Sequence, residues 1–81
     1  MVKVVLWGSL RAAAGGTEAV EVEAGNIRSL FNKLETEYPG LEPHIKRGIA
    51  VSINGRIFRD SWDERIPENA EVYLLPRIAG G

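Results

Sequence analysis

One segment of helical periodicity, residues 26–38, stands between two groups of strand-like segments, and this arrangement limits the folds open to the chain. Its apolar residues recur at the spacing of an amphipathic helix: Ile27, Leu30, Phe31, Leu34 and Tyr38. Asn26 can cap the first turn, and Pro39-Gly40 marks the end. The pattern predicts one main helix with an apolar face that needs a sheet to cover it.

The segments on either side of this helix have the alternation and β-branched composition of strands. They are residues 2–7, 18–23, 49–53, 56–58 and 71–75. Asn54-Gly55 is a strong signal for a two-residue hairpin turn, so the third and fourth segments should pair antiparallel. Pro43 favours a short helical turn over residues 41–47, and residues 59–70 should form a polar loop.

A chain of 81 residues has material for one small core. We therefore expect an α+β domain in which the helix lies across one face of the sheet. Because side chains alternate between the two faces of a strand, the apolar set of each strand should face the helix. The predicted core consists of Val2, Val4, Leu6, Val20, Val22, Ile27, Leu30, Phe31, Leu34, Ile49, Val51, Ile53, Val72 and Leu74.

The opposite face of the sheet should be open to solvent but not uniformly polar. Lys3 fixes its phase, because an unpaired lysine is rarely buried, and Val5 and Trp7 then share its side of the strand. Tyr73 and Leu75 of the last strand lie on the same face. Contiguous apolar surface of this kind predicts a docking site for a partner protein. The alternative is that the loop carrying Trp62 shields Trp7.

Composition excludes several functions. Cysteine is absent, which removes disulfides, thiolate metal sites and cysteine nucleophiles. Ten basic against eleven acidic residues give no excess charge for nucleic acid, and no stretch approaches the ~20 apolar residues of a membrane span. No phosphate-binding loop is present, and His44 has no second ligand nearby. We expect a cytoplasmic protein that binds neither cofactor nor metal.

The sequence ends in two glycines, Gly80-Gly81, after a short segment that follows the last strand. We predict a folded domain over residues 1–76 and a flexible tail over residues 77–81. Glycine has no side chain to obstruct a narrow channel, and five extended residues reach about 17 Å, enough to enter a partner's active site. A carboxylate must be activated before it can react, for example as an acyl adenylate. The alternative is a chance ending.

Six segments together resemble the MoaD/ThiS family of sulfur carriers over essentially the whole chain. They are Val2-Lys3-Val4-Val5-Leu6-Trp7, Leu10-Arg11, Gly15-Gly16, Glu37-Tyr38-Pro39-Gly40-Leu41, Val51-Ser52-Ile53-Asn54-Gly55 and Leu74-Leu75-Pro76-Arg77-Ile78-Ala79-Gly80-Gly81. The resemblance implies a β-grasp, ubiquitin-like fold with a mixed sheet of four to five strands. It also implies that Gly81 is adenylated by an E1-like enzyme, which uses ATP, and is then converted to a thiocarboxylate.

The resemblance further implies that Arg77, Ile78, Ala79 and Gly80 form the tail that carries Gly81 into a sulfur-accepting enzyme. Leu10-Arg11 and Leu75-Pro76 favour the molybdopterin synthase small subunit, whose thiocarboxylate donates sulfur in the active site of the large subunit. Such a chain is a sulfur-donating subunit and does not catalyse alone. Carriers for thiamine thiazole or cysteine synthesis are alternatives, as is a ubiquitin-like modifier of lysines or a binding module.

Overall fold

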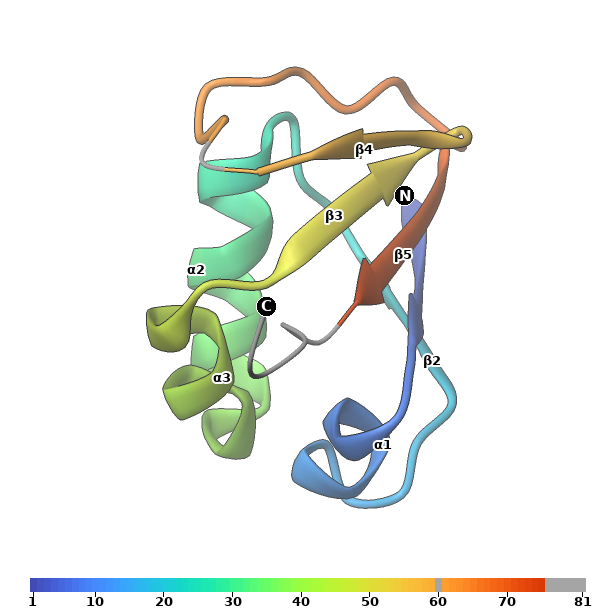
Figure 1. Cartoon of the computed structure of the whole chain (residues 1–81). Coiled ribbons are helices and arrows are strands. Elements are labelled where there is room, and N and C mark those ends of the chain that lie inside the picture. The colour runs from blue at the N-terminus through green and yellow to red at the C-terminus, as the bar shows by residue number, and fades with distance from the viewer. Residues whose placement is uncertain (60, 76–81) are drawn as a thin grey trace.

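The sheet is mixed and has five strands, in the order β2-β1-β5-β3-β4, with α2 and α3 on one side of it (Figure 1). The computed structural model describes residues 1–59 and 61–75. The strands are β1 (Val2–Leu6), β2 (Ala19–Val22), β3 (Ala50–Ile53), β4 (Arg56–Phe58) and β5 (Glu71–Leu75). The predicted α+β fold is confirmed. The predicted boundary at residue 76 and the tail lie outside the described residues.

The two central strands, β1 and β5, run parallel, with Val5 opposite Tyr73. The other neighbouring pairs in the sheet are antiparallel. The hairpin predicted at Asn54-Gly55 is present and pairs Ile53 with Arg56. Asn54 and Gly55 have φ values of 49° and 90°, the positive values that a type I′ hairpin turn requires.

The main helix, α2 (Ile27–Glu37), begins where the sequence predicted. The Asn26 side chain accepts a hydrogen bond of 2.8 Å from the backbone N–H of Ser29, which satisfies one free donor of the first turn. Two further N–H groups donate to the loop after β4: Ile27 to the Glu64 carbonyl and Arg28 to the Trp62 carbonyl, at 3.1 and 2.9 Å. These bonds attach the loop to the start of the helix.

The predicted core is confirmed, since every residue assigned to it is buried. Six further buried residues come from segments that the sequence analysis left as turns, loops or short helical pieces: Leu10, Ala14, Leu41, Ile45, Ile66 and Ala70. The helix α1 (Ser9–Ala13) was missed, because five residues are too few for periodicity to show. The short helical turn expected over residues 41–47 is present as η1 (Pro39–Leu41) and α3 (Glu42–Arg47).

Gly40 marks the closest backbone approach in this part of the fold. A Cβ atom built on Gly40 would lie 2.2 Å from the carbonyl oxygen of Ala13, so η1 packs directly on the end of α1. We expect Gly40→Ala to lower the free energy of unfolding by ~1–3 kcal/mol through overpacking. Urea unfolding tests this, with Gly25→Ala as the control, because a Cβ at Gly25 meets no atom within 4 Å. Equal losses for the two variants would contradict the expectation.

Candidate docking surface

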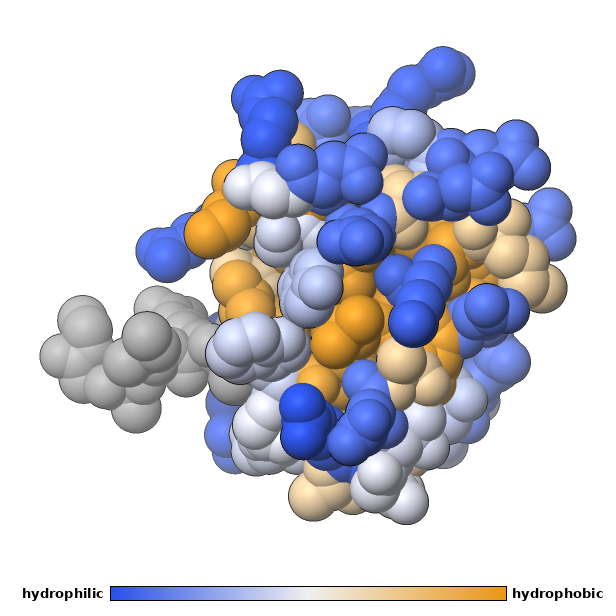
Figure 2. All heavy atoms as spheres, turned by 90° about the vertical axis from the view of Figure 1, so that its right-hand side faces the viewer, coloured by the Kyte–Doolittle hydropathy of each residue, from blue (hydrophilic) through white to orange (hydrophobic). Residues whose placement is uncertain are grey.

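The face of the sheet opposite α2 is defined by the alternation of the two central strands. Val4 and Leu6 of β1, and Val72 and Leu74 of β5, are completely buried on the helix side. The residues between them therefore point away from α2. Figure 2 views this face and shows apolar side chains gathered near its centre with charged side chains around them.

Five residues form what we call the apolar patch: Val5, Trp7, Ile57, Tyr73 and Leu75. Trp7 and Ile57 are 51% and 60% exposed, and the other three are half-buried. The strand register places Val5 beside Tyr73, and Ser52 pairs with Tyr73 on one side and with Ile57 on the other. Val5 and Tyr73 thus share one face with Leu75 and Ile57, Trp7 follows directly after β1, and large exposed apolar side chains of this kind are suited to binding another protein.

The open face changes character along the central strands. Where β1 and β5 begin, the register places Lys3 between Glu21 and Glu71, so this end is charged. Where the strands end, Trp7 and Leu75 make the surface apolar. Leu75 is the last residue of β5, so the apolar end lies beside the point where the predicted tail begins. The tail residues Arg77, Ile78, Ala79, Gly80 and Gly81 lie outside the described residues.

The backbone on both sides of Trp7 is held by α1. The carbonyl of Trp7 accepts a hydrogen bond of 3.1 Å from the N–H of Leu10. The preceding carbonyl, that of Leu6, accepts one of 3.0 Å from Nε of Arg11. The exposed indole is therefore presented from a fixed backbone, which lowers the entropy that a partner must remove on binding.

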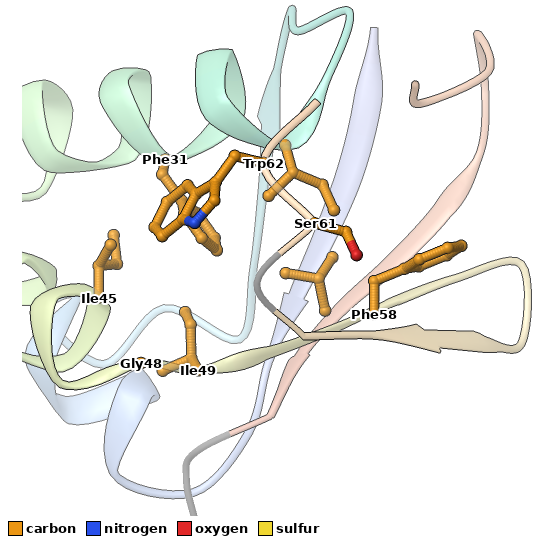
Figure 3. A pocket seen from close by; sticks show the side chains of 9 residues that line it. Phe31, Ile45, Gly48, Ile49, Phe58, Ser61 and Trp62 are labelled. Atoms are coloured by element: carbon orange, nitrogen blue, oxygen red, sulfur yellow. The ribbon is translucent and has the colours of Figure 1, made fainter. Parts of the chain in front are cut away.

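The second tryptophan, Trp62, lies in a different part of the molecule and does not shield Trp7. Its ring meets Phe31 of α2 edge-on, with centroids 5.2 Å apart and an interplanar angle of 80°. Trp62 and Phe31 line a cavity of about 20 Å³ between α2, α3 and the β3–β4 hairpin (Figure 3). This space holds about one water molecule, so Trp62 has a packing role there.

Ile57 is the patch residue that sequence reasoning missed. A two-residue turn at Asn54-Gly55 fixes the hairpin register, and this register sets Ile57 opposite Ser52. Ser52 lies between the core residues Val51 and Ile53, so strand alternation places Ser52, and with it Ile57, on the open face. The sequence therefore contains the information that places Ile57, but it emerges only when the register is followed through the turn into the second strand of the hairpin.

The described part of the chain offers neither a membrane span nor a group of metal ligands. No helix among residues 1–59 and 61–75 is both long and apolar enough to cross a membrane. Within the same ranges, no three histidine, aspartate or glutamate side chains are grouped as ligands for a metal ion. The apolar patch is thus the feature of the described surface that best supports a function.

Comparison with known proteins gives the same class of fold. A chain of the BexX/CysO complex from Amycolatopsis orientalis superposes with a TM-score of 0.81 at 22% identity, covering 100% of both chains. The small archaeal modifier protein 1 of Methanosarcina acetivorans superposes with a TM-score of 0.81 at 25% sequence identity, and the match covers 99% of this chain and 95% of that one. A chain in the complex of subunits 1 and 2 of the molybdopterin-converting factor from Helicobacter pylori superposes with a TM-score of 0.71 at 22% sequence identity. The match covers 99% of this chain and 97% of that one.

These likenesses define a ubiquitin-like β-grasp domain, as the resemblance had implied. The sequence pattern of the ThiS family matches residues 4–81, and the chain belongs to that family. The predicted membership of the MoaD/ThiS group of sulfur carriers is therefore confirmed. No individually curated protein is similar enough in sequence to count as a match.

Proposed function

We propose that this chain carries sulfur as a thiocarboxylate on Gly81 and donates it in the synthesis of molybdopterin. The observation that carries the proposal is that the ThiS-family match runs through Gly81, while the apolar patch lies at the end of β5, next to the segment that bears this glycine. A partner docked on the patch has the glycine within reach of its own active site. The globular domain then supplies recognition, and the tail supplies the reacting atom.

The proposed chemistry needs two steps. A carboxylate oxygen of Gly81 attacks the α-phosphorus of ATP held by an E1-like enzyme; the acyl–phosphate bond forms and pyrophosphate leaves. A hydrosulfide ion supplied by a separate donor then attacks the acyl carbon, AMP leaves with the bonding electrons, and loss of the S–H proton leaves a thiocarboxylate. Since the sequence contains no phosphate-binding loop, ATP is assigned to the activating partner.

The acceptor that we propose is the large subunit of molybdopterin synthase. Support comes from Leu10-Arg11 and Leu75-Pro76, which resemble that branch of the family. The test supplies the thiocarboxylated chain to three reconstituted acceptor systems, for molybdopterin, thiamine thiazole and cysteine. We expect sulfur transfer into the dithiolene of molybdopterin. Transfer into the thiazole or cysteine product instead would reassign the pathway while leaving the carrier role intact.

A second candidate function is modification of other proteins. One similar structure, at 25% identity, is named a small archaeal modifier protein, and the same activated Gly81 could be attacked by the amine of a lysine to form an isopeptide. Mass spectrometry of proteins from the native cells distinguishes the two. Lysines carrying the glycine remnant of this chain support modification, whereas a free thiocarboxylate without conjugates supports the carrier role alone.

The two tryptophans provide a matched test of the docking surface. Trp7→Ala should weaken binding to the E1-like partner by ~2 kcal/mol or more, because a central aromatic anchor contributes strongly to an interface. Its effect on unfolding should be small, since the ring is 51% exposed. Trp62→Ala should do the reverse, because that ring packs on Phe31. Calorimetric affinity and urea unfolding of both variants are the measurements. A destabilised Trp7→Ala domain with unchanged affinity would remove the docking role.

A further inference from the structure

The edge strand β2 offers a second surface, separate from the apolar patch. Among residues 1–59 and 61–75, β2 has a neighbouring strand, β1, on one side only. An edge strand can accept another extended segment through its free backbone groups.

The register identifies the free groups. Glu18 lies in register opposite Leu6, and its carbonyl accepts a hydrogen bond of 2.9 Å from the N–H of that residue. Hydrogen-bonded and non-bonded pairs alternate along an antiparallel ladder, so Val20 is the next residue of β2 that bonds to β1. The N–H and C=O groups of Ala19 and Glu21 therefore point away from the sheet.

Beside these groups runs an open groove of about 550 Å³ between β2 and α2. The charged residues that line it are Glu21, Glu23, Glu37 and Lys33, all of them exposed, and the register sets Glu21 beside Lys3 on the open face of the sheet. Met1 also lines the groove, and its terminal amine adds one positive charge where the chain begins at that residue. With the exposed Glu18 at the start of the same edge, four carboxylates stand against Lys3, Lys33 and the terminal amine, so the edge is complementary to positive charge.

We propose that β2 binds an extended, lysine- or arginine-bearing segment of a partner protein, which adds to the sheet as a sixth strand. Main-chain hydrogen bonds to Ala19 and Glu21 would supply the pairing, and alternate basic side chains would meet the carboxylates of the groove. The site lies on the far side of β2 from β1, so its occupant does not cover Trp7. This inference does not depend on the chemistry proposed for Gly81.

Charge opposes one of the two ways in which a second copy of the chain could pair with β2. Two β2 strands paired edge to edge would bring Glu21 and Glu23 of both copies together, and like charges facing each other destabilise such a pair. Pairing of β2 with the β4 edge of a second copy has no such repulsion, because β4 begins at Arg56. Because this contact joins two different edges, each added copy leaves a free edge for the next, and the assembly should grow as the protein concentration rises.

The experiment titrates the full chain with a short capped peptide in which lysine and valine alternate. We expect saturable amide shifts along β2 and α2 in heteronuclear NMR spectra, and slower hydrogen exchange at Ala19 and Glu21. Binding should weaken as salt rises from low to physiological concentration. A peptide with glutamate in place of lysine should bind at least about tenfold less tightly, in keeping with charge complementarity across an interface.

Three variants separate backbone pairing from charge. Glu21→Pro removes an outward N–H at a position where an edge strand tolerates proline, and should weaken binding about three- to tenfold beyond Glu21→Gln, which keeps that donor. Lys33→Gln should strengthen binding, because it removes a positive charge from the groove. If Glu21→Pro fails to fold, which its NMR spectrum will show, the Glu21→Gln and Lys33→Gln pair still tests the proposal through effects of opposite sign.

Several results would overturn the proposal. One is that the peptide shifts only amides of the apolar patch, and another is that the glutamate peptide binds equally well. A third is that no amide of β2 shows a saturable shift, in which case the acidic side chains of this edge serve to prevent aggregation. Sedimentation tests for a second copy of the chain at this edge. In that case the measured mass rises with protein concentration, and the Arg56→Glu variant has a lower mass than the wild type at the same concentration.

Discussion

Deleting Gly81 should abolish adenylation by an E1-like enzyme while leaving the domain folded. The expected loss is complete, because the proposal places the reacting carboxylate on this residue. The core of the described residues, 1–59 and 61–75, is complete without Gly81, so the free energy of unfolding should not change. ATP–pyrophosphate exchange measures the first effect and urea unfolding the second. Unchanged exchange after the deletion would contradict the role of Gly81.

A second tail variant distinguishes the need for the terminal carboxylate from the need for a slim segment that carries it into the active site. Gly80→Val keeps the terminal carboxylate but adds a β-branched side chain next to it, which should obstruct a narrow active-site channel. We expect exchange to be strongly reduced although the carboxylate remains. Adding one residue after Gly81 is the matched control for chain length. If every one of these variants behaved like the wild type, the tail would be a tolerant chain end and the glycines would carry no function.

Phe31→Ala should produce the largest loss of stability of any single truncation that we consider. Phe31 is 5% exposed, lies on the apolar face of α2 and meets Trp62 edge-on. Removing an aromatic ring from such a site costs ~3–5 kcal/mol, against ~5–15 kcal/mol for the stability of a whole domain. Urea unfolding at constant pH measures the loss.

The other phenylalanine of the chain provides the control. Phe58 is half-buried on the edge strand β4, where Arg56 lies 5.4 Å from its ring centre. Phe58→Ala should therefore lose clearly less free energy of unfolding than Phe31→Ala, because less apolar surface leaves water at that position. A loss below ~1 kcal/mol for Phe31→Ala would mean that the packing of α2 is not as described.

The sequence predicted the strands and the main helix because their signals are local and repeated. Alternation over residues 2–7 and helical spacing over residues 27–38 each run long enough to fix a face as well as an element. The Asn26 cap and the turn at Asn54-Gly55 then set where elements begin and in which register they pair. The predicted core follows from these two kinds of signal, and the structure confirms it.

Elements stabilised by tertiary contacts were not predictable in the same way. α1 has five residues and is held by Leu10 in the core and by the close packing of Gly40 on Ala13, contacts between distant parts of the chain. Ile66 and Ala70 are buried because the loop after β4 is bonded to the start of α2. No short-range pattern reports such packing.

The same distinction between local patterns and tertiary contacts applies to the candidate site. The face shared by Val5, Trp7, Tyr73 and Leu75 follows from strand parity, so the sequence could place it. The position of Trp62 could not be derived, because its loop has no periodicity, and only the structure shows that it packs on Phe31. The role of Gly81 follows from resemblance and remains a proposal.

Intact-mass analysis of the chain isolated from its native cells tests the carrier role most directly. We expect a species heavier than the sequence mass by the difference between one sulfur and one oxygen atom. Fragmentation should locate the added mass on Gly81, and alkylation of the thiocarboxylate should shift it further. A population that carries only the unmodified carboxylate, even when the activating enzyme is present and sulfur is in supply, would contradict the central claim.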